Sequence, residues 1–456
     1  MLKPGPSLSQ TATKADQEAV INPDIDTLFQ RLARHDKAYG AVAVMKNGEL
    51  IHNQAYGYSR LKDETQKAAT PTTEYHIGSI TKTFTATLIM QLVEEGALSL
   101  DTRLAEFYPE IPNADAITIE HLLRHRSGLY NLTIDTAWRA RQSQYLSHEE
   151  MLERFRAYEP QFEPDSQFQY SNTNYVLLGY IVEDLTNQSY ARALEERIAK
   201  PLSLDHTHFP KATLRPGQAA SYRWGTDGWD TLEPTAHRVT HGAGALLSTP
   251  TDLLRFYRGL CLGELVDTAT FNQMTDMGGG FSQRNSYGLG LLQMPFGKRI
   301  GYGHTGGIDG YRASASYFPD DSLGIAITTN ALNYELNQIA IDVLTATFKP
   351  SAFSPPEFDQ KDLSLSPERL QRMTGYYTSE TLPLDITLRL EDEQLEAQAT
   401  NQSAFPLTPT SDTSFKYVPA GVKMQFKRSE SDQLNQFYLL QGGGKFLFER
   451  KEEQKN

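Results

Sequence analysis

The apolar pattern begins at about residue 24. Ile25, Leu28 and Leu32 recur at intervals of three and four residues, which predicts a helix. A β-hairpin should follow, because apolar residues from Ala41 to Met45 precede Asn47-Gly48 and a second strand from Glu49. Asn-Gly favours this turn since both positions need positive φ. Residues 1–23 lack an apolar period, so we expect a flexible N-terminal tail there.

The middle of the chain, about residues 74–300, predicts mostly helices. One apolar stripe runs through Phe84, Leu88 and Leu92 and ends at Gly96; another runs through Val176, Leu177, Tyr180, Ile181 and Leu185. Strand patterns return at 311–318 and 324–329, and a helix is expected over 336–348. We therefore expect residues 24–348 to form one α+β unit, with an antiparallel sheet from its two ends and a helical part inserted between them.

A different pattern follows a proline-rich stretch. Prolines at 350, 355, 356 and 367 predict a linker over residues 349–366. Beyond it, apolar and polar residues alternate, as at Ile386, Leu388 and Leu390 and again at Val422, Met424 and Phe426. Several such segments at short spacing predict a small all-β barrel or sandwich over residues 367–450.

Composition narrows the function classes. The 456 residues carry 43 Lys and Arg against 56 Asp and Glu, a net charge of −13, which argues against nucleic acid as the main partner. A single cysteine excludes an intramolecular disulfide and a thiolate metal cluster. The sequence has no apolar run long enough to predict a membrane span. The localisation stays open: cytoplasmic if the start is native, periplasmic or secreted if a signal peptide has been removed.

Ser-x-x-Lys occurs twice, at Ser59 to Lys62 and at Ser79 to Lys82. Ser59 follows the hairpin in a polar stretch without helical period, so we set it aside. Ser79 stands where a helix is expected to begin, and three residues bring Lys82 over the same face. Unpaired N–H groups at the helix start would also favour negative charge on Ser79.

A serine hydroxyl needs a base to become a nucleophile. Lys82 can serve only when neutral, which costs about 4–5 kcal/mol at pH 7. Tyr170-Ser171-Asn172, the one Tyr-x-Asn in the sequence, offers a partner, because a lysine and a tyrosine can share one proton. Asn172 would hold Lys82 and the substrate amide by hydrogen bonds.

Gly303-His304-Thr305-Gly306-Gly307 precedes the returning strands. Its glycines would let substrate approach the backbone closely. The Gly307 N–H, together with the Ser79 N–H, would form an oxyanion hole, in which one donor is typically worth about 2.7–4 kcal/mol.

These three segments, in this order, resemble the serine β-lactamase and penicillin-binding-protein superfamily, in the branch of class C β-lactamases, DD-carboxypeptidases, D-aminopeptidases and related esterases. Two further stretches support the resemblance, His121 to Leu129 and Gly242 to Pro250. It covers residues 24–348. It implies an acyl-enzyme on Ser79, with Lys82 and Tyr170 moving protons and without a cofactor. It also implies a small-molecule or peptide substrate, bound by Asn172, Thr305 and the neighbouring His304 and Gly306.

One departure shifts the expected substrate. β-Lactamases of this branch carry a lysine where this chain has His304, and histidine is mostly neutral at pH 7. The resemblance thus favours hydrolysis of amides or esters, including D-amino-acid peptides. A class C-like β-lactamase, an acyltransferase and a catalytically idle ligand-binding protein remain alternatives. His304 could also be purely structural, and the oligomeric state is open.

Other patterns are weaker. His121 and His125 are four residues apart on an expected helix, a metal-compatible spacing, but no third ligand is suggested and no metal is expected. Residues 301–306 match Gly-x-Gly-x-x-Gly without a following helix, so dinucleotide binding is not expected. The absence of Gly-x-Ser-x-Gly argues against an α/β-hydrolase.

Overall fold

The computed structural model describes residues 21–451 except 62–65, 137–141, 145, 211–216, 279–286, 359–362, 383, 401, 403, 418–421, 430–432 and 442–443. Most of the expected N-terminal tail, residues 1–20, and Lys62 of the first Ser-x-x-Lys therefore lie outside the described residues. Ser59 lies on the short strand β3 (Tyr58–Arg60), away from any helix start.

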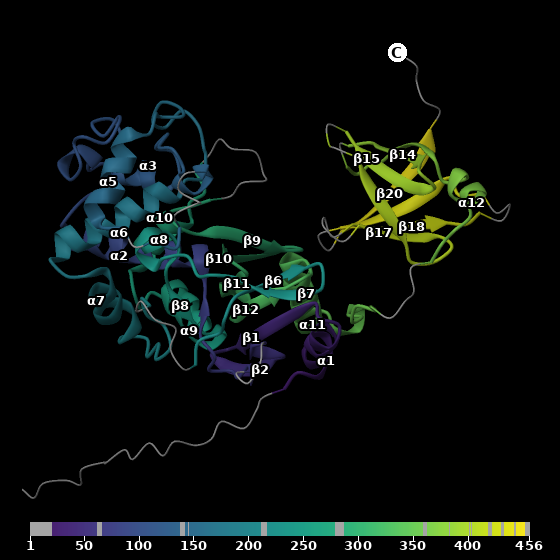
Figure 1. Cartoon of the computed structure of the whole chain (residues 1–456), viewed down its shortest axis with the longest axis horizontal. Helices are drawn as coiled ribbons and strands as arrows, with labels where there is room; N and C mark the ends of the chain where they lie inside the picture. Colours follow the sequence, from purple (N-terminus) through teal and green to yellow (C-terminus); the bar gives the residue numbers. More distant parts are fainter. Residues whose placement is uncertain are drawn as a thin grey trace, which may run out of the picture.

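A six-stranded antiparallel sheet is built from the two ends of the larger part of the molecule (Figure 1). Its strand order is β2 (Glu49–Tyr56), β1 (Ala38–Lys46), β12 (Leu323–Leu332), β11 (Tyr311–Phe318), β10 (Arg299–Ile308) and β9 (Leu292–Phe296). The expected Asn47-Gly48 turn joins β1 to β2, and both residues have positive φ. The predicted α+β sheet is thus confirmed.

Both faces of the sheet are covered. Val42 and Val44 of β1 pack with Leu28 of helix α1 (Pro23–Arg34) and with helix α11 (Leu336–Phe348). Ala43 and Met45, which alternate with them, join the larger core on the other face, beside helix α9 (Pro250–Cys261). β1 reads as a nearly continuous apolar run because it is buried on both sides.

The inserted part is mainly helical. Besides α9, its described α-helices are α2 (Thr81–Glu94), α3 (Ile119–Leu123), α5 (His148–Ala157), α6 (Asn172–Thr186), α7 (Tyr190–Leu194), α8 (His237–Gly244) and α10 (Thr268–Thr275). Short strands occur there too: β4 (Lys67–Ala68), β5 (Tyr75–His76), β6 (Tyr222–Gly225), β7 (Gly228–Thr231) and β8 (Leu247–Ser248). Helix α2 lies at the centre, with every residue from Thr81 to Met90 buried.

Two expectations need correction. Strands return at Leu292, before residue 311, because β9 and β10 precede β11. The four glycines of β10 hid it, since glycine is depleted in strands. His121 and His125 do not share a helix, because α3 ends at Leu123 and His125 has a φ of +57°.

Gly301 to Gly306 lie within β10, which excludes the strand-to-helix turn of a dinucleotide site.

The C-terminal part is a closed antiparallel barrel. Of the two predicted forms, the barrel is therefore confirmed over the sandwich. After helix α12 (Pro367–Gln371), its strands are β13 (Gly375–Thr378), β14 (Ile386–Glu391), β15 (Gln394–Ala399), β16 (Phe405–Pro409), β17 (Ser414–Tyr417), β18 (Val422–Lys427), β19 (Gln436–Gln441) and β20 (Gly444–Lys451). β20 pairs with β13 and closes the ring. Phe415, Phe437 and Phe448 fill its core.

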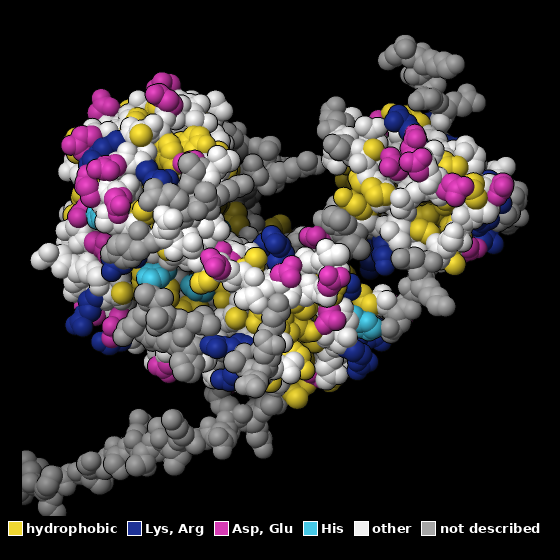
Figure 2. Space-filling model, viewed as in Figure 1, with side chains coloured by type: hydrophobic (Ala, Val, Ile, Leu, Met, Phe, Trp, Pro, Cys, Tyr) yellow, Lys and Arg dark blue, Asp and Glu magenta, His cyan; other side chains and the backbone are white. Residues whose placement is uncertain are grey.

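The proline-bearing segment before the barrel is partly anchored. Phe358 packs against His35 and Tyr334, with ring centroids 5.4 and 5.6 Å away. Among the described residues, no helix is long and apolar enough to cross a membrane. Figure 2 shows acidic and basic side chains interspersed over the face that it draws.

Candidate active site

Ser79 lies in a single 3-10 turn, Gly78–Ile80, that leads directly into α2. Lys82 is in the first turn of α2, and its Nζ is 3.0 Å from the Ser79 Oγ. The serine is half-buried, whereas Lys82 has no exposed surface. The sequence-predicted pair is therefore assembled, with the hydroxyl accessible and the amine enclosed.

Two more oxygens surround the Lys82 amine. Nζ is 2.7 Å from Asn172 Oδ1 and 2.7 Å from the Ala243 carbonyl oxygen. Within the described part of the chain, no carboxylate forms an ion pair with it, and burial lowers the pKa of Lys82 well below its ordinary value. A neutral amine has two N–H groups and one lone pair. Asn172 and Ala243 can accept the two N–H groups, which leaves the lone pair for the Ser79 O–H.

Tyr170 lies two residues before Asn172, the first residue of α6. Its ring centroid is 4.9 Å from Lys82 Nζ. Burial raises the pKa of Tyr170, and a hydrogen bond with the Ser79 side chain partly opposes that shift. The opposite pKa shifts of Lys82 and Tyr170 favour a neutral amine beside a neutral phenol.

Two glycines let β10 lie directly against the serine turn. A Cβ on Gly306 would be 1.9 Å from the Ile77 carbonyl oxygen and 3.1 Å from the Ser79 nitrogen. A Cβ on Gly78, whose φ is +51°, would be 2.6 Å from the Gly307 nitrogen. The backbone nitrogens of Ser79 and Gly307 are thus brought to the same end of the site, as an oxyanion hole requires. Thr305, on the same strand, is exposed.

His304 is placed differently from the other candidates. It is buried, and its Nδ1 contacts the Thr305 carbonyl oxygen while its Nε2 is 3.2 Å from the Tyr287 hydroxyl. Because a carbonyl only accepts, the ring proton is on Nδ1 and Tyr287 donates to Nε2. Burial lowers the pKa of His304 to about 3. His304 is therefore a neutral ring whose nitrogens are both used by the protein.

Sequence reasoning missed His125 as part of the site. Its ring lies 4.1 Å from that of Tyr170 and 4.8 Å from that of Tyr287, centroid to centroid. Its Nδ1 accepts a hydrogen bond from the Ser171 N–H, and burial lowers the pKa of His125 well below its usual value. This neutral ring packs against the candidate phenol. Its positive φ gave no signal in the sequence.

Asn131 and Thr133 were also missed. The Asn131 Oδ1 accepts from the backbone N–H and from the Nδ2 of Asn172, both at 3.1 Å. Thr133 Oγ1 accepts from the same Nδ2, also at 3.1 Å. These contacts fix the amide orientation that turns the Asn172 Oδ1 toward Lys82. Their only sequence signal was nearness to the Ser127-Gly128-Leu129 stretch.

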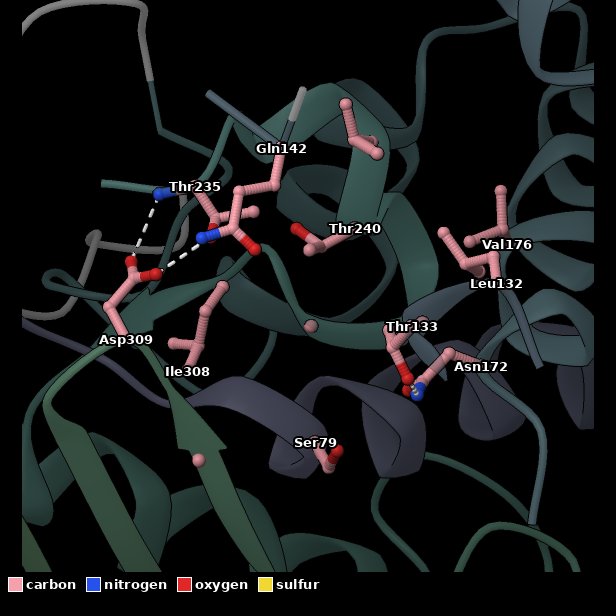
Figure 3. A pocket seen from close by; sticks show the side chains of 14 residues that line it. Ser79, Leu132, Thr133, Gln142, Asn172, Val176, Thr235, Thr240, Ile308 and Asp309 are labelled. Carbon is pink, nitrogen blue, oxygen red and sulfur yellow. Dashed lines mark hydrogen bonds between the residues drawn. The ribbon is translucent and has the colours of Figure 1, made fainter. Parts of the chain in front are cut away.

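Ser79 and Gly307 line two cavities. The first, of about 310 Å³, extends along Asn172, Val176 and Ile308 (Figure 3). The second, of about 380 Å³, is lined by the following residues: Phe168, Tyr170, Tyr287, Leu292, His304, Thr305 and Gly306. A substrate bound across Ser79 can therefore place one group on each side of the hydroxyl. All these lining residues precede the barrel.

The sequence and the fold are similar to those of known proteins. The Beta-lactamase family model matches residues 25–346. The chain belongs to the beta-lactamase family. This family member is also 26% identical to penicillin-binding protein 4* of Bacillus subtilis, in an alignment that covers 92% of this chain and 96% of that protein.

Two solved structures are similar to this beta-lactamase-family protein. A D-stereospecific amidohydrolase from Streptomyces sp. is 28% identical, with a TM-score of 0.62, covering 72% of this chain and 99% of that one. An octameric penicillin-binding protein homologue from Pyrococcus abyssi has a TM-score of 0.65 at 24% identity, covering 93% of this chain and 99% of that one. The second shows the fold alone. Family and fold identify the protein as a serine hydrolase.

Proposed function

We propose that Ser79 is the nucleophile, that neutral Lys82 takes its proton, and that Tyr170 passes a proton to the leaving group. One observation carries the proposal: a fully buried amine lies 3.0 Å from the serine hydroxyl, with neutral oxygens as its other partners. A carboxylate partner would have favoured the ammonium form instead.

Acylation then moves one proton through the site. Ser79 Oγ attacks the substrate carbonyl carbon as its proton passes to the Lys82 lone pair. The carbonyl oxygen becomes an oxyanion that the Ser79 and Gly307 N–H groups bind. When the carbon–leaving-group bond breaks, the Tyr170 O–H protonates the leaving group, and the Lys82 ammonium restores the phenol. Deacylation repeats these steps with water as the nucleophile, and Ser79 is released with its proton.

We propose amides or esters of D-amino acids as substrates. The name of the Streptomyces amidohydrolase, D-stereospecific, supports this, as does the name of a 26% identical Staphylococcus aureus relative, teichoic acid D-alanine hydrolase. Asn172 and Thr305, on opposite sides of Ser79, would hydrogen-bond the bound substrate. His304 would support Thr305 and Tyr287, because its own nitrogens are occupied.

A class C-like β-lactamase is the second candidate, since Ser79, Lys82 and Tyr170 would serve it equally. The neutral, buried His304 disfavours it, because a β-lactam carboxylate would find no positive charge on that side chain. Product analysis with an added alcohol or amine separates a hydrolase from an acyltransferase.

The test is active-site labelling followed by a substrate panel. We expect a fluorophosphonate to add one adduct to the wild type and none to Ser79→Ala, by intact mass. We expect faster turnover of p-nitrophenyl esters and D-alanine p-nitroanilide than of nitrocefin. An adduct that survives Ser79→Ala contradicts the nucleophile. Reversible binding without turnover across the panel indicates the idle binding protein.

We also propose that residues 24–348 and 367–450 are separate domains joined by the segment 349–366. The barrel has a core of its own, which supports this division.

A further inference from the structure

The first cavity has two chemically different walls. Leu132 and Val176 form an apolar wall, while Gln142, Thr235 and Asp309 lie on the opposite side (Figure 3). Asp309 is the one ionisable side chain among the described residues that line this cavity. An acyl group that fills the cavity therefore meets hydrocarbon on one side and a carboxylate on the other.

The Asp309 carboxylate is held in place. Thr235 donates to it twice, from its N–H at 3.0 Å and from its Oγ1 at 2.7 Å. Asp309 and Gly310 form the tight turn between β10 and β11. The Gly310 N–H donates a hydrogen bond to Ser221 Oγ at 2.8 Å. Each carboxylate oxygen keeps a further lone pair for a ligand. Aspartate is common in such turns, but asparagine would serve the turn equally well.

The surrounding charges leave this carboxylate available. Burial raises the pKa of Asp309, while Thr235 and the Arg312 charge oppose that shift. The Arg312 guanidinium is bound by backbone oxygens, with its Nη1 3.0 Å from the Asp309 carbonyl oxygen and 2.7 Å from that of Tyr311. The carboxylate is half-buried, so an ammonium that reached it would be partly shielded from water.

The spacing from the reacting centre fits an aminoacyl group. Asp309 is two residues beyond Gly307, so their Cα atoms are at most about 7 Å apart. A substrate carbonyl bound by the Gly307 N–H would thus lie within a few bonds of the carboxylate, a separation similar to that between the carbonyl and the amine of an aminoacyl group.

We propose that Asp309, held by Thr235, binds an ammonium group on the acyl part of the substrate, so that acyl groups with a free amine are preferred over their N-acylated counterparts. The inference rests on the proposed function and names the chemistry of the group transferred to Ser79.

The test compares matched substrates. Wild type should hydrolyse D-alanine p-nitroanilide at least about tenfold faster in kcat/KM than N-acetyl-D-alanine p-nitroanilide. Asp309→Asn should reduce kcat/KM for the free amine about 10- to 100-fold and leave the acetylated substrate within about threefold. Nα-acetyl-D-lysine p-nitroanilide distinguishes a distal ammonium from an α-ammonium, and a selective loss on either one supports the proposal.

Two controls separate binding from structure. Asp320→Asn makes the same charge change at an exposed residue of the turn after β11 and should alter neither substrate. In the wild type, the ratio of the two alanine substrates should fall as pH rises through about 8, where the α-amine loses its proton. This measurement needs no variant, so it remains decisive if Asp309→Asn does not fold.

Equal losses on both substrates in Asp309→Asn, or a pH-independent ratio in the wild type, would overturn the role of Asp309. Such a result, with Ser79-dependent turnover and fluorophosphonate labelling intact, would leave the proposed function standing. Turnover that survives Ser79→Ala would instead count against the proposed function.

Discussion

Replacement of Gly306 by alanine should separate β10 from the serine turn. The added Cβ would lie 1.9 Å from the Ile77 carbonyl oxygen, whereas real contacts of this kind begin at about 3.0 Å. The clash involves backbone on both sides, so no side chain can rotate away from it. Either β10 or the turn must move by roughly 1 Å, and the Gly307 N–H would move with the strand.

The expected cost follows from that displacement. A misplacement of about 1 Å can reduce a rate about 100-fold, and loss of one oxyanion-hole donor costs about 10²–10³ in kcat. We therefore expect Gly306→Ala to lower kcat on a p-nitrophenyl ester by about 10²–10³, with a smaller change in KM. The donor stabilises the developing oxyanion more than the neutral carbonyl, so kcat bears most of the loss.

Gly244→Ala is the matched control. Gly244 lines the first cavity beside Ser79, whereas Gly306 lines the second, and a Cβ on Gly244 would meet its nearest heavy atom, the Thr240 Cβ, at 3.6 Å, an ordinary contact. Steady-state kinetics of both variants, with thermal melts to establish folding, make the comparison. A folded Gly306→Ala enzyme within about threefold of wild type, or an equal loss in Gly244→Ala, would refute the assigned oxyanion hole.

Four further outcomes are expected. Lys82→Arg should lower kcat by about 10²–10⁴, because arginine stays protonated. In the wild type, kcat/KM should rise with pH to a plateau, with the midpoint of the rise below the ordinary lysine pKa. A flat pH profile would contradict Lys82 as the base. Asn131→Ala should raise the activation free energy of the reaction by about 1–2 kcal/mol, as measured from kcat. Asn131→Asp is the comparison variant, because it retains an acceptor oxygen for Asn172. His304→Lys should lower Tm, since it buries a cation near Lys82, without creating nitrocefin turnover. Phe437→Ala should destabilise the barrel by about 3–5 kcal/mol and leave kcat unchanged; lost activity would contradict separate domains.

The sequence was sufficient where a local pattern determined the structure. The Asn47-Gly48 hairpin and the alternation in the barrel required only turn chemistry and period two. β10 was missed because its glycines, among them Gly303 and Gly306, serve close backbone approach: a Cβ on Gly303 would be 2.0 Å from the Ala315 carbonyl oxygen. Strand propensity carries no information about that approach, which depends on neighbours distant in the chain.

The candidate site was predictable to the extent that residue type determines chemistry. Ser79, Lys82, Tyr170 and Asn172 are brought together as expected. The position of His304 was not predictable, because its interior hydrogen bonds depend on Tyr287, a residue with no motif of its own.

The charges around Ser79 follow a simple physical logic. The groups that contact the Lys82 amine are a hydroxyl, an amide and a carbonyl, and burial keeps the nearby His125 and His304 neutral. Because no carboxylate among the described residues pairs with Lys82, desolvation lowers its pKa without opposition from such a charge, and the amine can accept and return a proton within one cycle. A carboxylate beside Lys82 would have favoured the ammonium form and removed the base. Asp309, the one carboxylate among the described residues that line the first cavity, is proposed to face the acyl group, where a fixed negative charge would select a substrate without fixing a proton on Lys82.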